Sequence, residues 1–280
     1  MPDDVVPVLQ HLLAARFDDP PRVDDGDLDN GVLKMLAARG SCRAFLERPV
    51  PPGWLEVLSA VALASPTKSD LQQRDIVLVQ DRSVRKRLVD LVPGQRWISD
   101  APALVVFCGN NRRQRLLHEW QNVPFVNDHL DAFFNATGDA AIALGAFVIA
   151  AEAMGLGCCP ISAVRNEAEA VSALLGLPDH VFPFAGLAIG FPQDRPTISK
   201  RLPLRVTCHM DRYREDNLEE DLRGYSDARA ASQPYDKERS AEISGPSDTY
   251  GWAEDKVRQY GFPERAGFGN FVRAKGFKLK

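Results

Sequence analysis

The chain has 280 residues, a formal net charge of −4 and 45% hydrophobic residues. This length and apolar content suffice for one large domain or two small ones, and the charge gives no reason to expect nucleic-acid binding. The N-terminus lacks the positive start and apolar run of a secretory signal, and no segment is apolar over the length that a bilayer requires. The 5 cysteines include no pair with metal-site or thioredoxin spacing. We therefore expect a cytoplasmic protein with reduced thiols, no metal centre and no membrane partner.

Residues 1–30 are predicted to form an N-terminal extension, with a short amphipathic piece over 8–13 and then an acidic, proline-bearing run. The compact core is predicted to occupy residues 31–280. Apolar spacing predicts helices over 32–37 and 55–61, and Pro52 suits the first turn of the second one.

Residues 75–79 and 103–108 are predicted strands, separated by a helix over 84–91. The second strand is apolar without alternation, as in a strand buried on both faces. The longest predicted helix spans 139–154 and is apolar nearly all round, which indicates a central or subunit-interface helix. A loop over 155–166 follows it.

Asn166 is a predicted N-cap for a helix that extends to Leu175, and residues 184–190 form another predicted strand. Strands and helices thus mix in an α+β pattern. From 212 to 250 the chain is polar, which predicts a partly mobile surface excursion. Aromatic residues then return, so the end of the chain is expected to pack onto a folded body: Trp252, Phe268, Phe271 and Phe277.

The most informative motif is Arg39-Gly40-Ser41-Cys42-Arg43. In an extended segment, residues two apart point to the same side, so Arg39, Ser41 and Arg43 would present one small cationic surface. Arginine can bond a phosphate or a polarised carbonyl at two places. The alternative is a solvated basic turn. Four other polar segments complete the pattern: 65–72, 94–96, 155–166 and 199–203.

In this order, these segments resemble the nitroreductase superfamily of FMN-dependent oxidoreductases, most closely the oxygen-insensitive NAD(P)H nitroreductase A branch. The resemblance covers residues from about 31 to 280. It implies an α+β fold, with a central mixed or antiparallel sheet surrounded by helices. It also implies an intertwined homodimer with one FMN in each of two clefts at the subunit interface.

The resemblance also implies the roles of the candidate residues. Arg39, Ser41 and Arg201 look like the phosphate cradle, with Gly40 between the first two and Lys200 assisting; Arg43 looks like the group beside flavin N1 and the C2 carbonyl. The ribityl chain and ring edge would be held by residues of two segments: Lys68, Ser69, Asp70, Gln72 and Gln95. The ring-facing loop would be formed by Pro160, Ile161, Ser162 and Ala163.

Such a site needs no side-chain nucleophile, because the flavin performs the redox chemistry and the protein supplies position and field. The resemblance implies that NADPH or NADH passes hydride to flavin N5 and leaves. A nitroaromatic or quinone-type acceptor then takes the same place, in a ping-pong sequence. A shared cleft agrees with the lack of a separate GxGxxG fingerprint.

Several positions depart from the family pattern. Lys68 replaces a serine, Asp70 replaces an aromatic residue, and Ser162 with Ala163 replace a glycine pair. The arginines that hold the NADPH 2′-phosphate are not in their usual place, and the possible substitutes are Arg223, Arg229 and Arg239.

Two alternatives therefore remain open. One keeps the fold and FMN for another reaction, such as flavin reduction, enone reduction, dehalogenation or a specialised biosynthetic oxidation. The other is a non-catalytic flavin- or nucleotide-binding protein.

Five aromatic residues belong either to the cleft rim or to the core: Trp97, Trp120, Phe125, Phe133 and Phe134.

Overall fold

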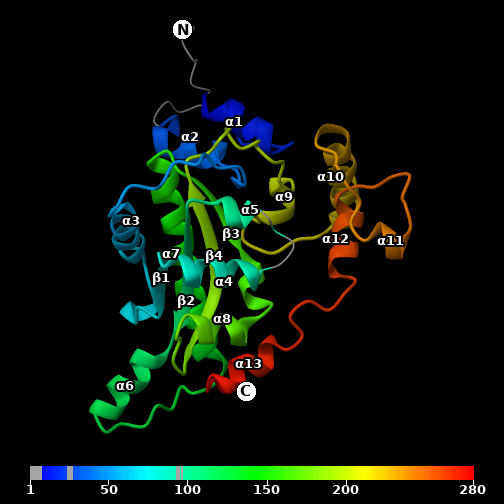
Figure 1. Cartoon of the computed structure of the whole chain (residues 1–280). Helices are drawn as coiled ribbons and strands as arrows, with labels where there is room; N and C mark the ends of the chain where they lie inside the picture. Colours follow the sequence, from blue (N-terminus) through cyan, green and yellow to red (C-terminus); the bar gives the residue numbers. More distant parts are fainter. Residues whose placement is uncertain (1–7, 24–27, 93–94, 96) are drawn as a thin grey trace. The chain divides into compact units, whose positions relative to one another are not determined.

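The computed structural model describes residues 8–23, 28–92, 95 and 97–280. Gly94 and Arg96 of one predicted site segment, and parts of the N-terminal extension, lie outside these residues. The chain divides into two compact units. Figure 1 labels the helices and strands of the whole chain. The first unit comprises Met1–Gly40 and Thr197–Glu264, and the second comprises Ser41–Pro196 and Arg265–Lys280.

The second unit is built on a four-stranded antiparallel sheet. Its strands, in the order β1-β2-β4-β3, are β1 (Arg74–Val79), β2 (Ala103–Asn110), β4 (Val181–Gly190) and β3 (Gly157–Ile161). The three strands predicted from the sequence are confirmed as β1, β2 and β4. Every residue of β2 is buried, as expected for a strand covered on both faces.

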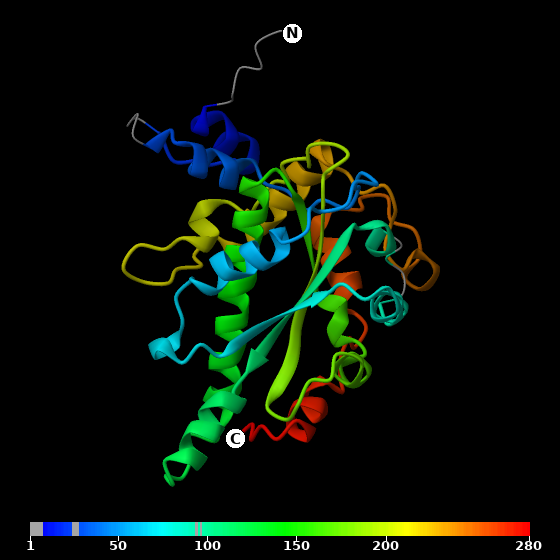
Figure 2. The same ribbon diagram turned by 60° about the vertical axis from the view of Figure 1, so that its left-hand side comes forward.

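Two helices cover one face of this sheet and two others cover the opposite face (Figure 2). α3 (Trp54–Leu63) and α7 (Leu130–Ala153) pack on the first face, where the rings of Phe107 and Phe147 meet edge to face with centroids 5.5 Å apart. α4 (Arg82–Asp90) and α8 (Ala168–Leu174) pack on the second. The remaining helices of this unit are η2 (Lys68–Asp70), α5 (Trp97–Asp100), α6 (Arg112–Trp120), η3 (Ser162–Arg165) and α13 (Phe268–Ala274).

The α7 helix begins nine residues earlier than its sequence pattern predicts, at Leu130, and it is not enclosed all round. Its length and composition alone would allow it to cross a membrane, contrary to the expectation that no segment qualifies. One side of the helix nevertheless packs on the sheet, with Ala136, Ala143 and Phe147 fully buried. We therefore regard α7 as a core helix of this unit.

The segment 155–166, expected to be a loop, contains the edge strand β3. Pro160 concealed this strand in the sequence, although proline is tolerated at a sheet edge. Two helix starts also differ from the expectation. Glu167 rather than Asn166 is the N-cap of α8, and Pro52 precedes Gly53, the N-cap of α3.

The end of the chain packs onto the second unit, as its aromatic residues predict. Phe271 and Phe277 are buried beside Phe182, and Phe133 lies 4.7 Å from the Phe182 ring centroid. Phe133 therefore belongs to the core, whereas Trp120 and Phe134 are exposed.

The first unit is helical. Its elements are α1 (Leu9–Arg16), α2 (Gly31–Ala38), α9 (Leu204–Thr207), α10 (Leu218–Ser232), α11 (Ala241–Ser244) and α12 (Trp252–Tyr260). α1 packs on α2 through Leu9, Leu12 and Ala37. The expected boundary between the N-terminal extension and the core, at residue 30, therefore falls between α1 and α2, which share one hydrophobic cluster. The polar excursion contains the 15-residue helix α10, which contacts α12 through Tyr225 and Trp252, with ring centroids 5.0 Å apart.

Candidate functional site

The segment from Arg39 to Arg43 has the alternation that the sequence predicts. Arg39 ends α2 with extended dihedral angles (φ −60°, ψ 150°). After it, Gly40 and Cys42 are buried, whereas Ser41 and Arg43 are exposed. The buried positions anchor the segment, so the polar side chains stay at the surface.

Two of the predicted phosphate ligands meet in the first unit. A cavity of about 450 Å³ is lined by polar and apolar side chains from three segments, which are Arg16, Phe17, Leu36, Arg39, Arg201, Leu202, Leu204 and Thr207. We call this cavity the arginine pocket. Arg39 and Arg201 are far apart in the sequence, and their shared pocket agrees with a common anionic ligand. Sequence reasoning missed Arg16, which lies in the supposed appendage.

Arg16 is 6% exposed, and its side chain is bound to main-chain carbonyls. Its guanidinium donates to Ala37 O (3.0 and 2.8 Å), Arg39 O (2.5 Å) and Ser199 O (3.2 Å). Burial, together with the nearby charges of Arg201 and Arg39, lowers the pKa of Arg16. This repulsion among like charges would be relieved by an anion.

Lys200 lies next to Arg201 in the sequence and has an acidic partner. Its ammonium group forms an ion pair with Asp18, and it does not line the arginine pocket. Asp19 accepts a hydrogen bond from Leu204 N (2.8 Å), and its carboxylate forms an ion pair with Arg205 (3.2 Å). Acidic residues just after α1 thus engage the basic turn of residues 199–205.

Arg43, the cation expected beside the flavin ring, belongs to the second unit. The main-chain nitrogen of Cys42 donates to Cys158 O (3.0 Å), which ties the segment to β3. The Arg43 guanidinium carbon lies 5.8 Å from the centroid of the Trp97 ring. Trp97 is therefore placed beside a candidate flavin ligand rather than only in the core.

The predicted ribityl segment is an exposed turn with an uncommon backbone. Ser69, Asp70 and Gln72 have positive φ angles of 48°, 55° and 52°. The carboxylate of Asp139, 2% exposed, accepts hydrogen bonds from Lys68 N (2.9 Å) and Gln73 N (2.8 Å). The turn is thus held at both ends by one buried group.

A second buried charge supports the chain just before this turn. Arg74 is 4% exposed and donates to Leu63 O (2.7 Å), Ser65 O (2.8 Å) and Pro66 O (3.2 Å). Burial lowers its pKa, and the charge of Asp139 partly opposes this effect. Sequence reasoning missed both residues, although an acid within an apolar helix requires a partner when buried.

The ring-facing candidates lie where β3 passes into η3. Pro160 and Ser162 are exposed, whereas Ile161 and Ala163 are buried. Neither Ser162 nor Ala163 has a positive φ, so their side chains create no backbone strain. The hydroxyl of Ser162 lies 3.5 Å from the guanidinium of Arg265, a cation that the sequence did not indicate. Gln95 is half-buried, and its main-chain carbonyl accepts a hydrogen bond from Ile98 N (3.0 Å).

These residues fit the parts of FMN. The arginine pocket offers guanidinium donors for a phosphate, and the exposed turn at 68–72 offers hydroxyl, carboxylate and amide groups suited to a polyol. The exposed guanidinium of Arg43 is a positive group of the kind that the electron-rich side of the ring would require.

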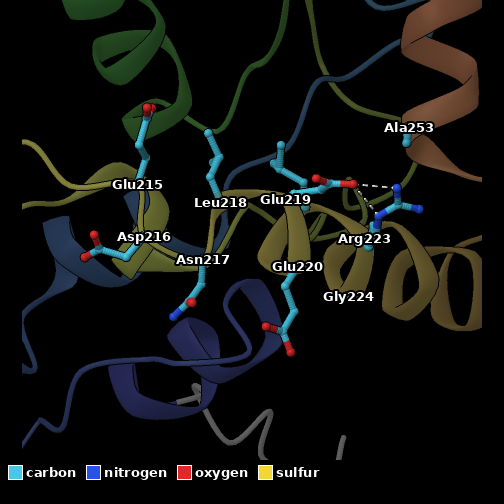
Figure 3. A pocket seen from close by; sticks show the side chains of 10 residues that line it. Glu215, Asp216, Asn217, Leu218, Glu219, Glu220, Arg223, Gly224 and Ala253 are labelled. Atoms are coloured by element: carbon cyan, nitrogen blue, oxygen red, sulfur yellow. Dashed lines mark hydrogen bonds and ion pairs between the residues drawn. The ribbon is translucent and has the colours of Figure 1, made fainter.

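The three arginines considered as ligands of the NADPH 2′-phosphate already have partners within the protein. The guanidinium of Arg223 lies 2.6 Å from the carboxylate of Glu219. Both residues line a cavity together with Glu215, Asp216 and Glu220, and Figure 3 shows the pair. Arg229 donates to Gln233 (3.1 Å), and Arg239 lies 3.4 Å from the buried carboxylate of Asp255. Arg223 and Arg239 thus have carboxylate partners, and Arg229 has a neutral amide partner.

Comparisons with known proteins give a consistent result. The nitroreductase family matches residues 36–191, and the C-terminal domain of that family matches residues 199–280. The FMN reductase (NAD(P)H) of Bacillus subtilis is 34% identical over 203 residues, which are 71% of this chain and 81% of the relative. The oxygen-insensitive NADPH nitroreductase of Salmonella typhimurium is 32% identical over 65% of this chain and 74% of its own length. The solved structure of B. megaterium NfrA2 has a TM-score of 0.80 at 28% identity, covering 90% of this chain and 99% of that one.

Proposed function

The chain belongs to the nitroreductase family of FMN-dependent NAD(P)H oxidoreductases, and from this premise we propose that it reduces nitroaromatic, quinone or similar electron-poor small molecules. The observation that carries the proposal is the arginine pocket, where Arg39 and Arg201 line one cavity with Arg16. A phosphate carries roughly two negative charges, so its withdrawal from water requires several fixed cations.

When bound, FMN supplies the redox chemistry, because it accepts hydride from NAD(P)H and passes electrons to the acceptor. The residues of this chain bind and orient it. Arg39, Ser41 and Arg201 would hold the phosphate, and the turn at 68–72 with Gln95 would hold the ribityl chain. Arg43 supplies fixed positive charge near N1, which favours the reduced ring. Residues 160–163, at the junction of β3 and η3, would lie against the ring.

We infer a homodimer from exposed apolar side chains on two helices of the second unit, α3 and α7, that pack against each other. Val57 and Val61 of α3 are 63% and 54% exposed, and Phe134 and Ile142 of α7 are 68% and 43% exposed. Several large apolar side chains exposed on neighbouring helices are typical of an interaction site. A second copy of the chain is the proposed occupant, and the cytoplasm is the proposed location. Phe134→Glu with Ile142→Glu should convert the dimer to a monomer in light scattering.

The function is tested first by the absorbance of the purified protein, since bound oxidised flavin absorbs at about 450 nm. NADPH oxidation is then measured with nitrofurazone and with menadione. Double-reciprocal plots of the initial rate against NADPH, at several acceptor concentrations, should give parallel lines, because one site serves both substrates in turn. Intersecting lines would contradict a shared site. A protein that stays colourless after incubation with FMN would contradict the whole proposal.

Reduction of free flavin is the second candidate, because relatives include proteins named FMN reductase. NADPH oxidation that is negligible with nitrofurazone and menadione but saturates with added FMN would favour this reaction over the first.

A further inference from the structure

We propose that Arg16 is a positioning residue of the phosphate site: it fixes the main chain on both sides of the arginine pocket, so that Arg39 and Arg201 face one phosphate. This inference rests on the proposed function. Arg16 precedes residue 36, where the match to the family begins. The support is therefore an addition that lies outside the family-matched part of this chain.

The first step of the argument is the end of α2. The last carbonyls of a helix have no partner within the helix and need donors from elsewhere. Arg16 supplies them, since its Nε and Nη2 donate to Ala37 O and its Nη2 also donates to Arg39 O. The guanidinium thus caps the helix at the residue that carries the first phosphate ligand.

The second step is the opposite side of the pocket. Arg16 Nη1 donates to Ser199 O (3.2 Å), and the carbonyl of Arg16 accepts from Arg201 N (2.8 Å). Arg16 therefore bonds to the backbone of Arg39 and to that of Arg201. A shift of Arg16 would move both ligands relative to each other.

The third step is the anchoring of Arg16 itself. It is the last residue of α1, whose Leu9 and Leu12 are buried against α2. The nitrogen of Leu9 also donates to the carboxylate of Asp29 (2.7 Å), which holds the start of the helix. A residue that positions others must itself be held, and both ends of α1 meet this condition.

The fourth step concerns charge. Arg16 brings a third guanidinium to the pocket, while Asp18, two residues later, pairs with Lys200. The segment after α1 therefore adds one cation to the pocket and neutralises another outside it. Three guanidinium groups line one pocket, and the positive charge that they bring to it favours a doubly charged phosphate.

The test compares two ligands, because riboflavin lacks the phosphate of FMN. Dissociation constants of both are measured for the wild type and Arg16→Gln by quenching of flavin fluorescence. We expect the FMN constant to rise about tenfold or more, equivalent to the loss of about one charge-assisted hydrogen bond. The riboflavin constant should change less than about twofold. Arg22→Gln is the matched control: it removes the same charge from an exposed site in the same segment, and neither constant should change.

Arg16→Lys keeps the charge but cannot donate from a planar fork, so FMN binding should remain weakened. Circular dichroism and the thermal midpoint establish that each variant is folded. The inference is overturned if Arg16→Gln binds FMN like the wild type, if FMN and riboflavin weaken equally, or if Arg16→Lys restores FMN binding fully. A wild type that binds neither flavin would instead contradict the proposed function.

Discussion

The buried carboxylate of Asp139, in the middle of α7, accepts a hydrogen bond of 2.8 Å from the main-chain nitrogen of Gln73. Its other oxygen accepts from Lys68 N at 2.9 Å, at the far end of the same turn. A core helix thus sets the conformation of an exposed segment that we propose to hold the ribityl chain. The buried carboxylate therefore supports this turn from the interior of the protein.

Asp139→Asn should destabilise the protein by about 1–3 kcal/mol, because the amide places a donor against a main-chain donor in a buried site. Urea unfolding measures this loss. FMN affinity should fall in the same variant, since the turn is released at one end.

Asp70→Asn is the control for this substitution. Asp70 is exposed, and its contact with Gln72 lies at the surface, so its effect on unfolding should stay within about 0.5 kcal/mol. Equal losses in the two variants would mean that burial of the Asp139 carboxylate is not the cause.

Gly157→Ala should destabilise the second unit, because a Cβ at this position would lie 2.6 Å from both Cβ and Sγ of Cys42. Overpacking of this kind costs about 1–3 kcal/mol. Cys42→Ala removes the sulfur atom and should relieve part of the clash. A double-mutant cycle in urea should therefore give a favourable coupling between the two substitutions, and strict additivity would contradict the contact.

Arg43→Gln should slow reduction of the bound cofactor by NADPH on the order of tenfold to a hundredfold, because a fixed cation near the ring is lost. Stopped-flow absorbance measures this step directly, and the midpoint potential of the flavin should become more negative. Arg48→Gln is the matched control, since Arg48 lies over the Phe191 ring at 3.8 Å in the same unit. A rate unchanged in Arg43→Gln would remove Arg43 from the site.

The stability of the second unit should decrease in acid through Asp128. Burial raises the pKa of this carboxyl, but hydrogen bonds from Arg115 and Lys278 outweigh burial and lower the pKa to about 2. An unfolded aspartate has a pKa of about 4. The stabilisation is therefore fully present above about pH 4 and is lost as the pH falls toward 2, by on the order of 2 kcal/mol.

Asp128→Asn should flatten this part of the pH dependence. Unfolding free energies at pH 5, 4, 3 and 2.5 measure the difference between the variant and the wild type. A gap that does not narrow as the pH falls would show that Asp128 does not account for the acid sensitivity.

The sequence predicted the central elements because their patterns are local. The buried strand at 103–108, the helix at 84–91 and the alternation from Arg39 to Arg43 depend on side-chain spacing, which survives in the fold. β3 was missed because its five residues include Pro160 and because an edge strand forms through a distant partner, here β4.

The supports of the site could not be predicted in the same way. Arg16 and Asp139 act through main-chain atoms 21 to 183 positions away, and contacts of such range leave no periodic pattern. A lone arginine after an amphipathic piece resembles an ordinary solvated helix end. The roles of Lys68, Gln72 and Gln95 toward FMN remain predictions from family resemblance.

The left-handed backbone of Ser69, Asp70 and Gln72 has a practical consequence for engineering. Each non-glycine residue in this conformation costs on the order of 1 kcal/mol, so glycine at Ser69 or Gln72 removes an intrinsic penalty. The same exchange would delete a polar side chain and loosen the turn. Selection for thermostability alone would therefore favour glycine at these positions and lower the affinity for the cofactor. Thermostability screens on this enzyme should measure bound flavin along with the melting temperature.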